Sequence, residues 1–212
     1  RYKANGKFSH DFHNYSDFSY YFVSDRGTWK NAVATPSENT STVSVTTYDK
    51  YVFHEKDSIS IVKSGRNFFW RSFAYHTSMT DNFPENNVTT DTATVYMHFA
   101  AAATVATHFD ITINGTNAGR SNIPATTSNG NESNFTTKFI PRGNSINFGI
   151  TYSKNTSTAN GWIDYIAVSL RKRLALENGF VNFRDLKSVG SGKIAEFSIS
   201  QATSKGFLPC FL

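Results

Sequence analysis

Few side chains in this sequence have the type and spacing that catalysis requires. The single cysteine, Cys210, lies in the stretch Leu208-Pro-Cys-Phe-Leu212, and apolar surroundings make a thiol unreactive. A nucleophilic cysteine also needs a base beside it in a preorganised site. The sequence contains no Gly-rich phosphate loop, G-x-S-x-G elbow or zinc-protease helix motif. It therefore predicts a chain that is not itself an enzyme.

Two groups of residues that contain histidine are candidates for metal or acid–base sites. His10 and His13 have the spacing of a metal-binding pair on a helix, but their aromatic neighbours indicate extended or irregular structure, and no third ligand is evident. His54 lies close to Glu55 and Asp57, yet side chains so near in sequence rarely converge in a strand or loop. A surface salt-bridge cluster is favoured there, and no metal or cofactor is predicted.

The sequence supports ligand binding better than catalysis, because three tryptophans could stack on sugar rings. They are Trp29, Trp70 and Trp162. Trp162 begins a strand-like segment that has Ile166 and Val168 at alternate positions, which favours packing in the core or at its rim. Asp164 would then be buried on that same face, where a carboxylate must find hydrogen bonds. A structural anchor is favoured for Asp164 over a ligand of a bound ion.

Arg66 is a further candidate, in the segment Ser64-Gly-Arg-Asn-Phe-Phe69. Gly65 permits a backbone turn that places the guanidinium directly before two aromatic rings. Arg66 either anchors the segment by pairing with Glu55 or Asp57, or presents its charge to an external partner. Anchoring is favoured because the acidic cluster already provides the carboxylate.

The composition defines the elements that must position these residues. The chain has 212 residues, with 19 Phe and 10 Tyr in a sequence rich in Thr, Ser and Asn, a mixture that favours strands joined by polar turns. No run approaches the roughly 18 apolar residues of a membrane helix. The net charge of +5 admits a polyanionic partner. The only basic run, Arg171 to Arg173, lacks interleaved aromatics, so it is interpreted as a solvated strand end, and no nucleic-acid partner is predicted.

Alternation of apolar and polar residues predicts the strands. They cover residues 18–23, 42–48, 95–99, 109–113, 135–139, 146–152, 162–170, 180–184 and 194–199. Asn114-Gly115 directly after one strand predicts a tight hairpin. Residues 48–65 are expected to form a short helix or an irregular crossover.

Strands at this spacing predict an all-β fold, a two-sheet β-sandwich of jelly-roll type with extra N-terminal strands. Residues 83–170 would form its body, residues 1–82 would supply N-terminal strands and a crossover, and residues 171–212 would supply C-terminal strands. Six residues in the apolar phase of their strands are expected to be buried between the sheets: Ile111, Ile113, Phe148, Ile150, Ile166 and Val168.

Several segments together resemble a known family. They are Gly6-Lys-Phe-Ser-His-Asp-Phe-His-Asn-Tyr-Ser-Asp17 with Tyr20-Tyr-Phe-Val23, His54-Glu-Lys-Asp57, Ser64-Gly-Arg-Asn-Phe-Phe69, Gly161-Trp-Ile-Asp-Tyr-Ile166, Arg171-Lys-Arg173, and Phe183-Arg-Asp-Leu with Val189-Gly-Ser-Gly. In this order they resemble the non-catalytic β-rich region ahead of the peptidase domain in PorU-like proteins. These are gingipain-type cysteine peptidases that act as type IX secretion sortases in Bacteroidota.

The resemblance implies an exported protein at the bacterial cell surface or outer membrane. This chain would be a scaffold or docking module, and its partners would be the parent peptidase domain and other secretion components or a glycan. No residue here matches the family's His/Cys dyad. The tail from Lys205 departs from the family pattern, so a truncated or frame-shifted gene product is expected. The alternative function is a carbohydrate-binding module of a surface or secreted bacterial protein.

Overall fold

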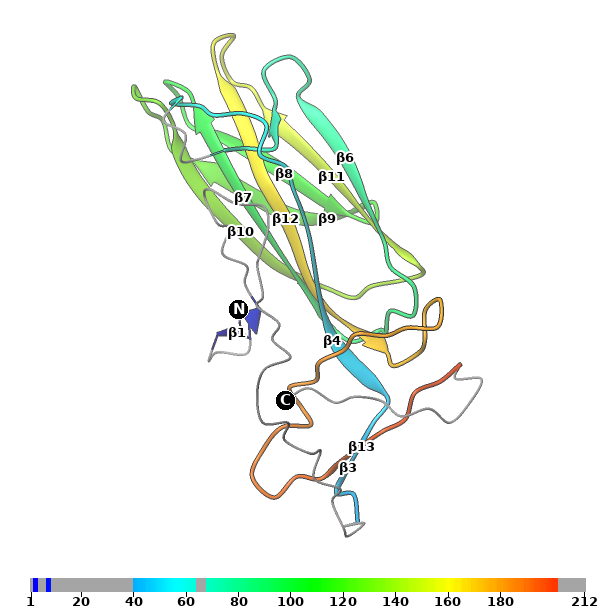
Figure 1. Ribbon diagram of the computed structural model, residues 1–212. Coiled ribbons are helices and arrows are strands. Elements are labelled where there is room, and N and C mark those ends of the chain that lie inside the picture. Colours follow the sequence, from blue (N-terminus) through cyan, green and yellow to red (C-terminus); the bar gives the residue numbers. More distant parts are fainter. Residues whose placement is uncertain (1, 4–6, 9–39, 64–67, 202–212) are drawn as a thin grey trace, which may run out of the picture.

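The computed structural model describes residues 2–3, 7–8, 40–63 and 68–201 (Figure 1). All regular secondary structure in these ranges is β-strand. The described residues contain no helix long and apolar enough to cross a membrane. Trp29, Arg66, the His10/His13 pair, the predicted strand at residues 18–23 and the tail from Lys205 lie outside the described residues.

One sheet of the sandwich contains five strands. Its order is β10 (Asn131–Phe139), β7 (Ala93–Ala102), β12 (Asn160–Arg173) and β4 (Thr47–Glu55), and β5 (Arg71–Ser72) also pairs with β12. All of these pairs are antiparallel. The long strand β12 therefore has neighbours on both sides and forms the spine of this sheet.

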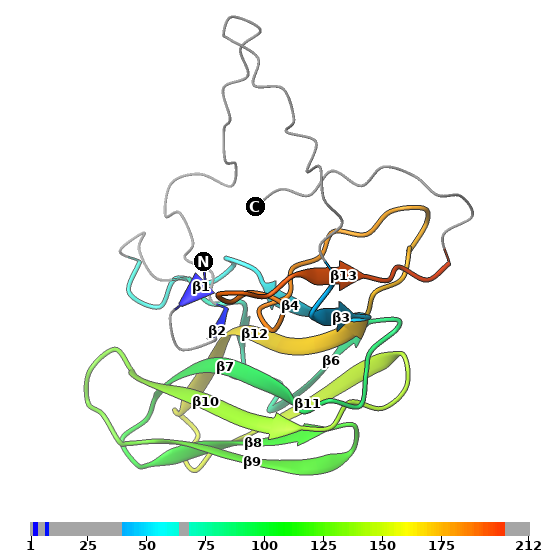
Figure 2. The ribbon, with the colours of Figure 1, turned by 90° about the horizontal axis from the view of Figure 1, so that it is seen from below.

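The second sheet contains four strands and packs face to face with the first (Figure 2). Its order is β6 (Ser78–Pro84), β11 (Ser145–Ser153), β8 (Thr107–Ile113) and β9 (Thr116–Ile123). From β6 to β12 the chain changes sheets at every connection except the β8–β9 hairpin, which is a jelly-roll arrangement. The all-β sandwich prediction is confirmed, and strands from before Phe83 complete both sheets.

The core lies between the sheets and follows the predicted alternation. Along β7, Val95, Met97 and Phe99 are fully buried, whereas the intervening Tyr96 and His98 are half-buried on the outer face. All six residues predicted for the core belong to this buried cluster: Ile111, Ile113, Phe148, Ile150, Ile166 and Val168. That prediction is confirmed, because period-two alternation sends alternate side chains to one face of a strand.

Small residues allow large rings to enter this core. A Cβ atom on Gly161 would lie 2.7 Å from Cζ of Phe109 and 3.0 Å from the ring of Tyr152. Gly161 is the cross-strand partner of Ala101, which is also buried. The close approach of the opposite sheet therefore requires a small residue on each of these two strands.

The predicted hairpin is confirmed at Asn114 and Gly115, which connect β8 to β9. Both have left-handed backbones, with φ of 51° and 77°. A two-residue loop with positive φ at both positions matches the right-handed twist of the flanking strands.

Two predictions about where strands form are wrong. Residues 48–65 were expected to form a short helix or an irregular crossover, but residues 48–55 form most of β4, because edge pairing with β12 compensates for a sequence without clear alternation. Residues 180–184 form no strand, and only Phe180 makes an isolated bridge, to Glu177. The predicted C-terminal strand is present as β13 (Ala195–Phe197), which pairs in parallel with β3 (Val43–Val45). At the N-terminus, β1 (Tyr2–Lys3) pairs with β2 (Lys7–Phe8).

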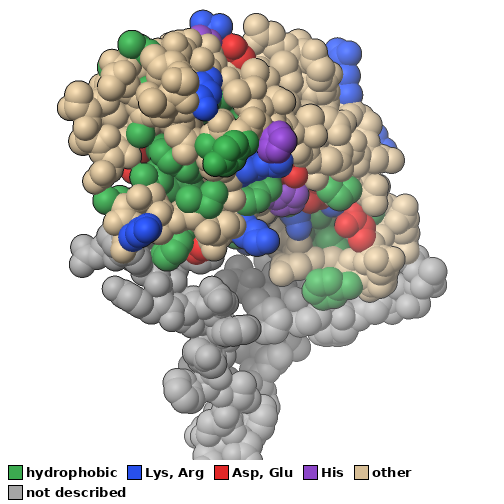
Figure 3. Space-filling model, turned by 90° about the horizontal axis from the view of Figure 1, so that it is seen from above, with side chains coloured by type: hydrophobic (Ala, Val, Ile, Leu, Met, Phe, Trp, Pro, Cys, Tyr) green, Lys and Arg blue, Asp and Glu red, His purple; other side chains and the backbone are tan. Residues whose placement is uncertain are grey.

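One end of the sandwich is formed by the loops that lead into β6 and β8. Apolar side chains gather on part of this end (Figure 3). The loops contribute Tyr75, which is 95% exposed, and Val105. The opposite end carries the segment that follows β12 and returns toward β3 (Figure 1).

Candidate functional site

The two described tryptophans are packing residues rather than exposed platforms. Trp162 is 8% exposed and packs with Phe69 and Ala100 in a small cluster on the outer face of the five-stranded sheet. Trp70 is half-buried and packs against the main core. Neither ring is placed to stack on a sugar from solvent.

A β-bulge in β12 decides which face each of its residues occupies. Ile163 pairs with Phe99 and Ile166 pairs with Met97, so Asp164 and Tyr165 together oppose the single residue His98. The extra residue reverses the alternation, and Ile163 and Ile166 are consequently both in the inner core. The expectation that Trp162 and Asp164 share a face with Ile166 and Val168 is therefore wrong.

The bulge brings Asp164 into contact with His98. Nδ1 of His98 lies 2.9 Å from Oδ2 of Asp164 and donates a hydrogen bond to it, and Nε2 lies 3.4 Å from a carboxylate oxygen of Glu132. The imidazole is also stacked against Phe69 and Tyr165, with ring centroids 6.0 and 6.1 Å away. Both nitrogens face carboxylates, so this arrangement holds the bulge and the overlying Phe69 in place.

The carboxylates around His98 favour its charged form. Burial lowers the pKa of the imidazole, but the hydrogen bond and charge of Asp164, together with Glu132, outweigh burial and raise the pKa above its ordinary 6.5. A histidine whose pKa is higher in the folded state contributes stability below its unfolded pKa. That contribution disappears as the pH rises through the folded pKa.

We therefore expect the stability contributed by His98 to be fully present below about pH 6.5 and to be lost as the pH rises above that value. The unfolding free energy, measured by urea denaturation from about pH 6 to about pH 9, should fall more steeply with pH in the native protein than in His98→Gln. Asp164→Asn should lower the His98 pKa, as read from the imidazole proton shifts in NMR. An identical pH slope in the native protein and His98→Gln would contradict this assignment.

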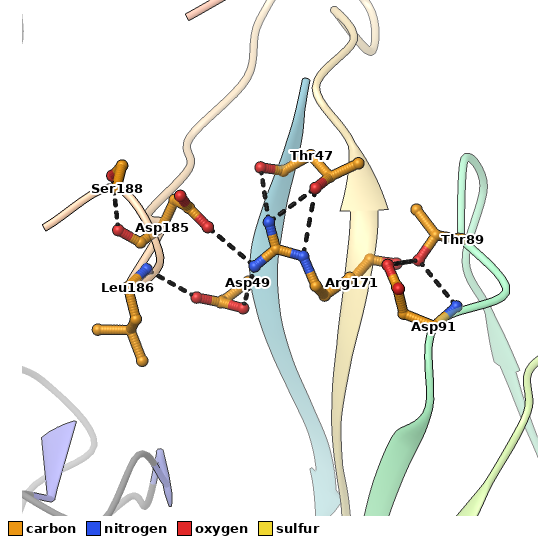
Figure 4. Close-up of polar contacts among 8 residues, drawn as sticks. All are labelled: Thr47, Asp49, Thr89, Asp91, Arg171, Asp185, Leu186 and Ser188. Carbon is orange, nitrogen blue, oxygen red and sulfur yellow. Dashed lines mark hydrogen bonds and ion pairs between the residues drawn. The ribbon is translucent and has the colours of Figure 1, made fainter. Parts of the chain in front are cut away.

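A second polar cluster is centred on Arg171, near the C-terminal end of β12 (Figure 4). Its Nη1 donates to Asp49 at 2.7 Å and to Asp185 at 2.8 Å, while Nε and Nη2 donate to Thr47. The Asp185 side chain is only 1% exposed. We call these four residues the Arg171 cluster. It joins the segment after β12 to the edge strand β4, and the backbone N–H of Leu186 adds a bond to Asp49.

Lys172 is the centre of a third polar cluster, on the opposite face of β12 from Arg171. Its Nζ lies 2.9 Å from Glu85 and 3.0 Å from Glu177, and its side chain is 3% exposed. Burial lowers the pKa of Lys172, but the two carboxylates outweigh it and raise the pKa above the ordinary value. The interpretation of Arg171–Arg173 as a solvated strand end is therefore wrong for Arg171 and Lys172, and only Arg173 is exposed.

The five-stranded sheet also carries a hollow of ≈ 950 Å³ with both polar and apolar lining residues, which we call the outer groove. Strands β4, β7, β10 and β12 all contribute to its lining, and residues 186–187 form one wall. The residues that line it are Asp49, Lys50, Asp91, Thr92, Thr94, Tyr96, Thr136, Thr137, Lys138, Ser169, Leu170, Arg171, Leu186 and Lys187. Asp91 lies at the end of the groove nearest Arg171, and it accepts a hydrogen bond from Thr89 (Figure 4).

The remaining acid–base candidates do not converge on a reaction centre. Nδ1 of His54 lies 2.7 Å from Asp81 on β6, and its ring stacks on Phe83 at 3.8 Å. Glu55, the next residue, lies on the opposite face of β4, so the pair does not act together. Among the described residues no group of His, Cys, Asp and Glu could hold a metal ion.

Sequence reasoning missed His98 and the Arg171 cluster. Arg171 and Asp49 are 122 positions apart, and nothing in their local patterns links them. One signal was present: Arg171 and Asp185 belong to two separate motifs of the family resemblance, Arg171-Lys-Arg173 and Phe183-Arg-Asp-Leu. Their ion pair brings those two motifs into contact.

The fold and these clusters define a jelly-roll β-sandwich domain with a fastened C-terminal segment. Its sequence matches no family model and no curated protein. Among solved structures it is similar to dimeric latent PorU from Porphyromonas gingivalis, with a TM-score of 0.63 and 18% identity. That match covers 77% of this chain and 16% of PorU, so the chain spans a small part of the PorU length. At this identity the likeness shows the fold alone.

Two carbohydrate-binding modules are more distantly similar. The CBM35 module from Cellvibrio japonicus has a TM-score of 0.40 and 10% identity, over 58% of this chain and 97% of the module. A family 35 module from Clostridium thermocellum has a TM-score of 0.36 and 13% identity, over 56% of this chain and 90% of the module. These TM-scores are too low to establish a shared fold.

Proposed function

We propose that this chain is a non-catalytic β-sandwich region of a PorU-like, gingipain-type cysteine peptidase at the bacterial cell surface. In this role it is a scaffold or docking module for the parent peptidase domain. The observation that carries the proposal is the extent of the likeness to PorU. The match covers more of this chain than the stretch from β4 to β12 contains, so it includes segments outside the sandwich.

The internal contacts support a scaffold role. The Arg171 cluster and the Lys172 pairs fasten residues 177–186 to the sandwich, so a domain attached beyond this segment would be held at a defined place. Buried Trp162 and half-buried Trp70 favour the scaffold over the alternative, a carbohydrate-binding module that stacks sugars on tryptophans.

Two experiments test this proposal, one on the gene and one on the purified protein. We expect the DNA downstream of this segment to contain a reading frame for a peptidase with a His/Cys dyad. The purified peptidase domain from that frame should bind the purified chain in isothermal titration calorimetry, because the two would share an interface in the parent protein. A neighbouring frame of another class, or a peptidase domain that does not associate with the chain, would contradict the proposal.

A further inference from the structure

A second hollow, of ≈ 440 Å³, lies at the end of the sandwich that carries the segment after β12 (Figure 1). We call it the amide hollow, because five of the seven described residues that line it have amide side chains. The seven are Asn86, Asn87, Asn144, Leu176, Glu177, Asn178 and Gln201. An amide group both donates and accepts hydrogen bonds, so this lining suits a ligand whose groups also do both.

The segments that form the amide hollow are held by backbone hydrogen bonds. The N–H of Arg173 donates to the carbonyl oxygen of Asn87 at 2.7 Å, and the N–H of Glu85 donates to that of Asn144 at 3.0 Å. A site whose backbone is already ordered loses little conformational freedom when a ligand binds. The amide hollow is therefore preorganised by the fold.

Left-handed backbones are concentrated at this hollow. Five non-glycine residues in the described ranges have a positive φ, and three of these five line it. They are Asn87, Asn178 and Gln201, with φ of 58°, 54° and 62°. Asparagine accepts this conformation more readily than glutamine does. Uncommon backbone conformations gather at ligand sites, where the surrounding structure maintains them.

Most of the amide groups are free to bind a ligand. Four of the five amide side chains are exposed, and they form no hydrogen bond within the part of the chain that the structure describes. These four belong to Asn86, Asn144, Asn178 and Gln201. The fifth, Asn87, donates a hydrogen bond to Oε1 of Glu177 at 3.1 Å.

The charges around the hollow disfavour an ionic ligand. Glu177 is the one charged residue in the described lining, and its carboxylate lies 3.0 Å from Nζ of Lys172. Lys172 also pairs with Glu85, so one positive charge faces two negative charges, and an anion would be repelled. Tight calcium sites use several carboxylates, whereas the described lining has one that is already paired.

An exposed aromatic ring lies beside the hollow. Phe180 is 71% exposed, and it exchanges two backbone hydrogen bonds with Glu177, of 3.0 and 3.1 Å. Side chains of directly opposed residues lie on the same face of a strand pair, so the Phe180 ring is next to the Glu177 side chain. An aromatic ring beside convergent polar groups is typical of sites for ligands that have both apolar and polar faces.

We propose that the amide hollow binds a neutral saccharide. The four free amide groups exchange hydrogen bonds with the sugar hydroxyls, and the Phe180 ring packs against the apolar face of a sugar ring. The volume of ≈ 440 Å³ is within the range of small-ligand sites. This inference does not depend on the peptidase proposal, and it requires none of the three tryptophans.

The test measures binding of the purified chain to maltotriose, chitotriose and trigalacturonate by isothermal titration calorimetry, at ligand concentrations up to about 10 mM. We expect at least one of the two neutral trisaccharides to bind, more tightly than the acidic one and equally well in EDTA. The double variant Asn86→Ala/Asn144→Ala should weaken that binding at least about fivefold. Phe180→Ala should also weaken it. Both asparagines are exposed and make no side-chain hydrogen bond to a described residue, so the double variant should fold normally.

The matched control is Asn122→Ala/Asn129→Ala, which removes two exposed amide groups outside the hollow. It should bind the saccharide as the native protein does. The proposal is overturned if neither neutral trisaccharide binds, if trigalacturonate binds as tightly, or if EDTA abolishes binding. It is also overturned if the control variant loses as much affinity as Asn86→Ala/Asn144→Ala. Each of these failures would leave the scaffold proposal intact, because that proposal concerns association with a peptidase domain.

Discussion

Replacing Arg171 with alanine should lower the free energy of unfolding by about 3–5 kcal/mol, the range for breaking a buried ion pair by removing one partner. The cost arises because Asp185, only 1% exposed, would keep a buried charge without its guanidinium. Asp49 would retain its bond from the Leu186 N–H, so Asp185 would be the residue most affected. Urea denaturation followed by tryptophan fluorescence measures this change.

Arg173→Ala is the matched control, because Arg173 is exposed two positions further along the same strand. It should change stability by no more than about 0.5 kcal/mol. The double variant Arg171→Ala/Asp185→Ala should recover part of the loss, since it removes the stranded carboxylate as well. Equal stabilities for Arg171→Ala and Arg173→Ala would show that the Arg171 cluster does not hold the C-terminal segment to the sandwich.

Replacing Phe148 with alanine should cost roughly 3–5 kcal/mol, because it leaves a cavity in the centre of the four-stranded sheet. Phe148 is 1% exposed and contacts the Phe83 ring edge-on, with centroids 5.2 Å apart. It is the cross-strand partner of Ile113 on β8. The loss should therefore appear as a lower urea midpoint for the whole domain rather than as local unfolding.

Thr151→Ala, on the exposed face of the same strand, serves as the comparison. It should remain within about 0.5 kcal/mol of the native protein. Phe148→Leu should cost less than Phe148→Ala, because leucine fills part of the space. A Phe148→Ala variant as stable as Thr151→Ala would mean that β11 presents the opposite face to the core.

The local alternation of apolar and polar residues was sufficient to predict most strands of the sandwich. The alternation around Ile111 and Ile150 identified both the strands and their buried faces, because successive side chains of a strand point to opposite sides. Asn114-Gly115 identified its hairpin, because few other residues accept two successive left-handed conformations.

Local pattern failed where a neighbouring strand decided the outcome. β4 forms because β12 supplies its hydrogen bonds, although its own sequence lacks clear alternation. The bulge at Asp164 and Tyr165 exists only in the pairing of β12 with β7. That bulge reversed the predicted face of Trp162, and it created the contact between Asp164 and His98.

By itself, the sequence determined that this protein is an all-β sandwich, that six named residues lie in its core, and where one hairpin turns. These features depend on interactions between residues close in the chain, or on the period of a single strand. The tertiary structure alone decided that Arg171 and Lys172 are buried and that His98 lies between two carboxylates. Each of these depends on side chains that are distant in sequence, and only the pairing of the strands brings them together.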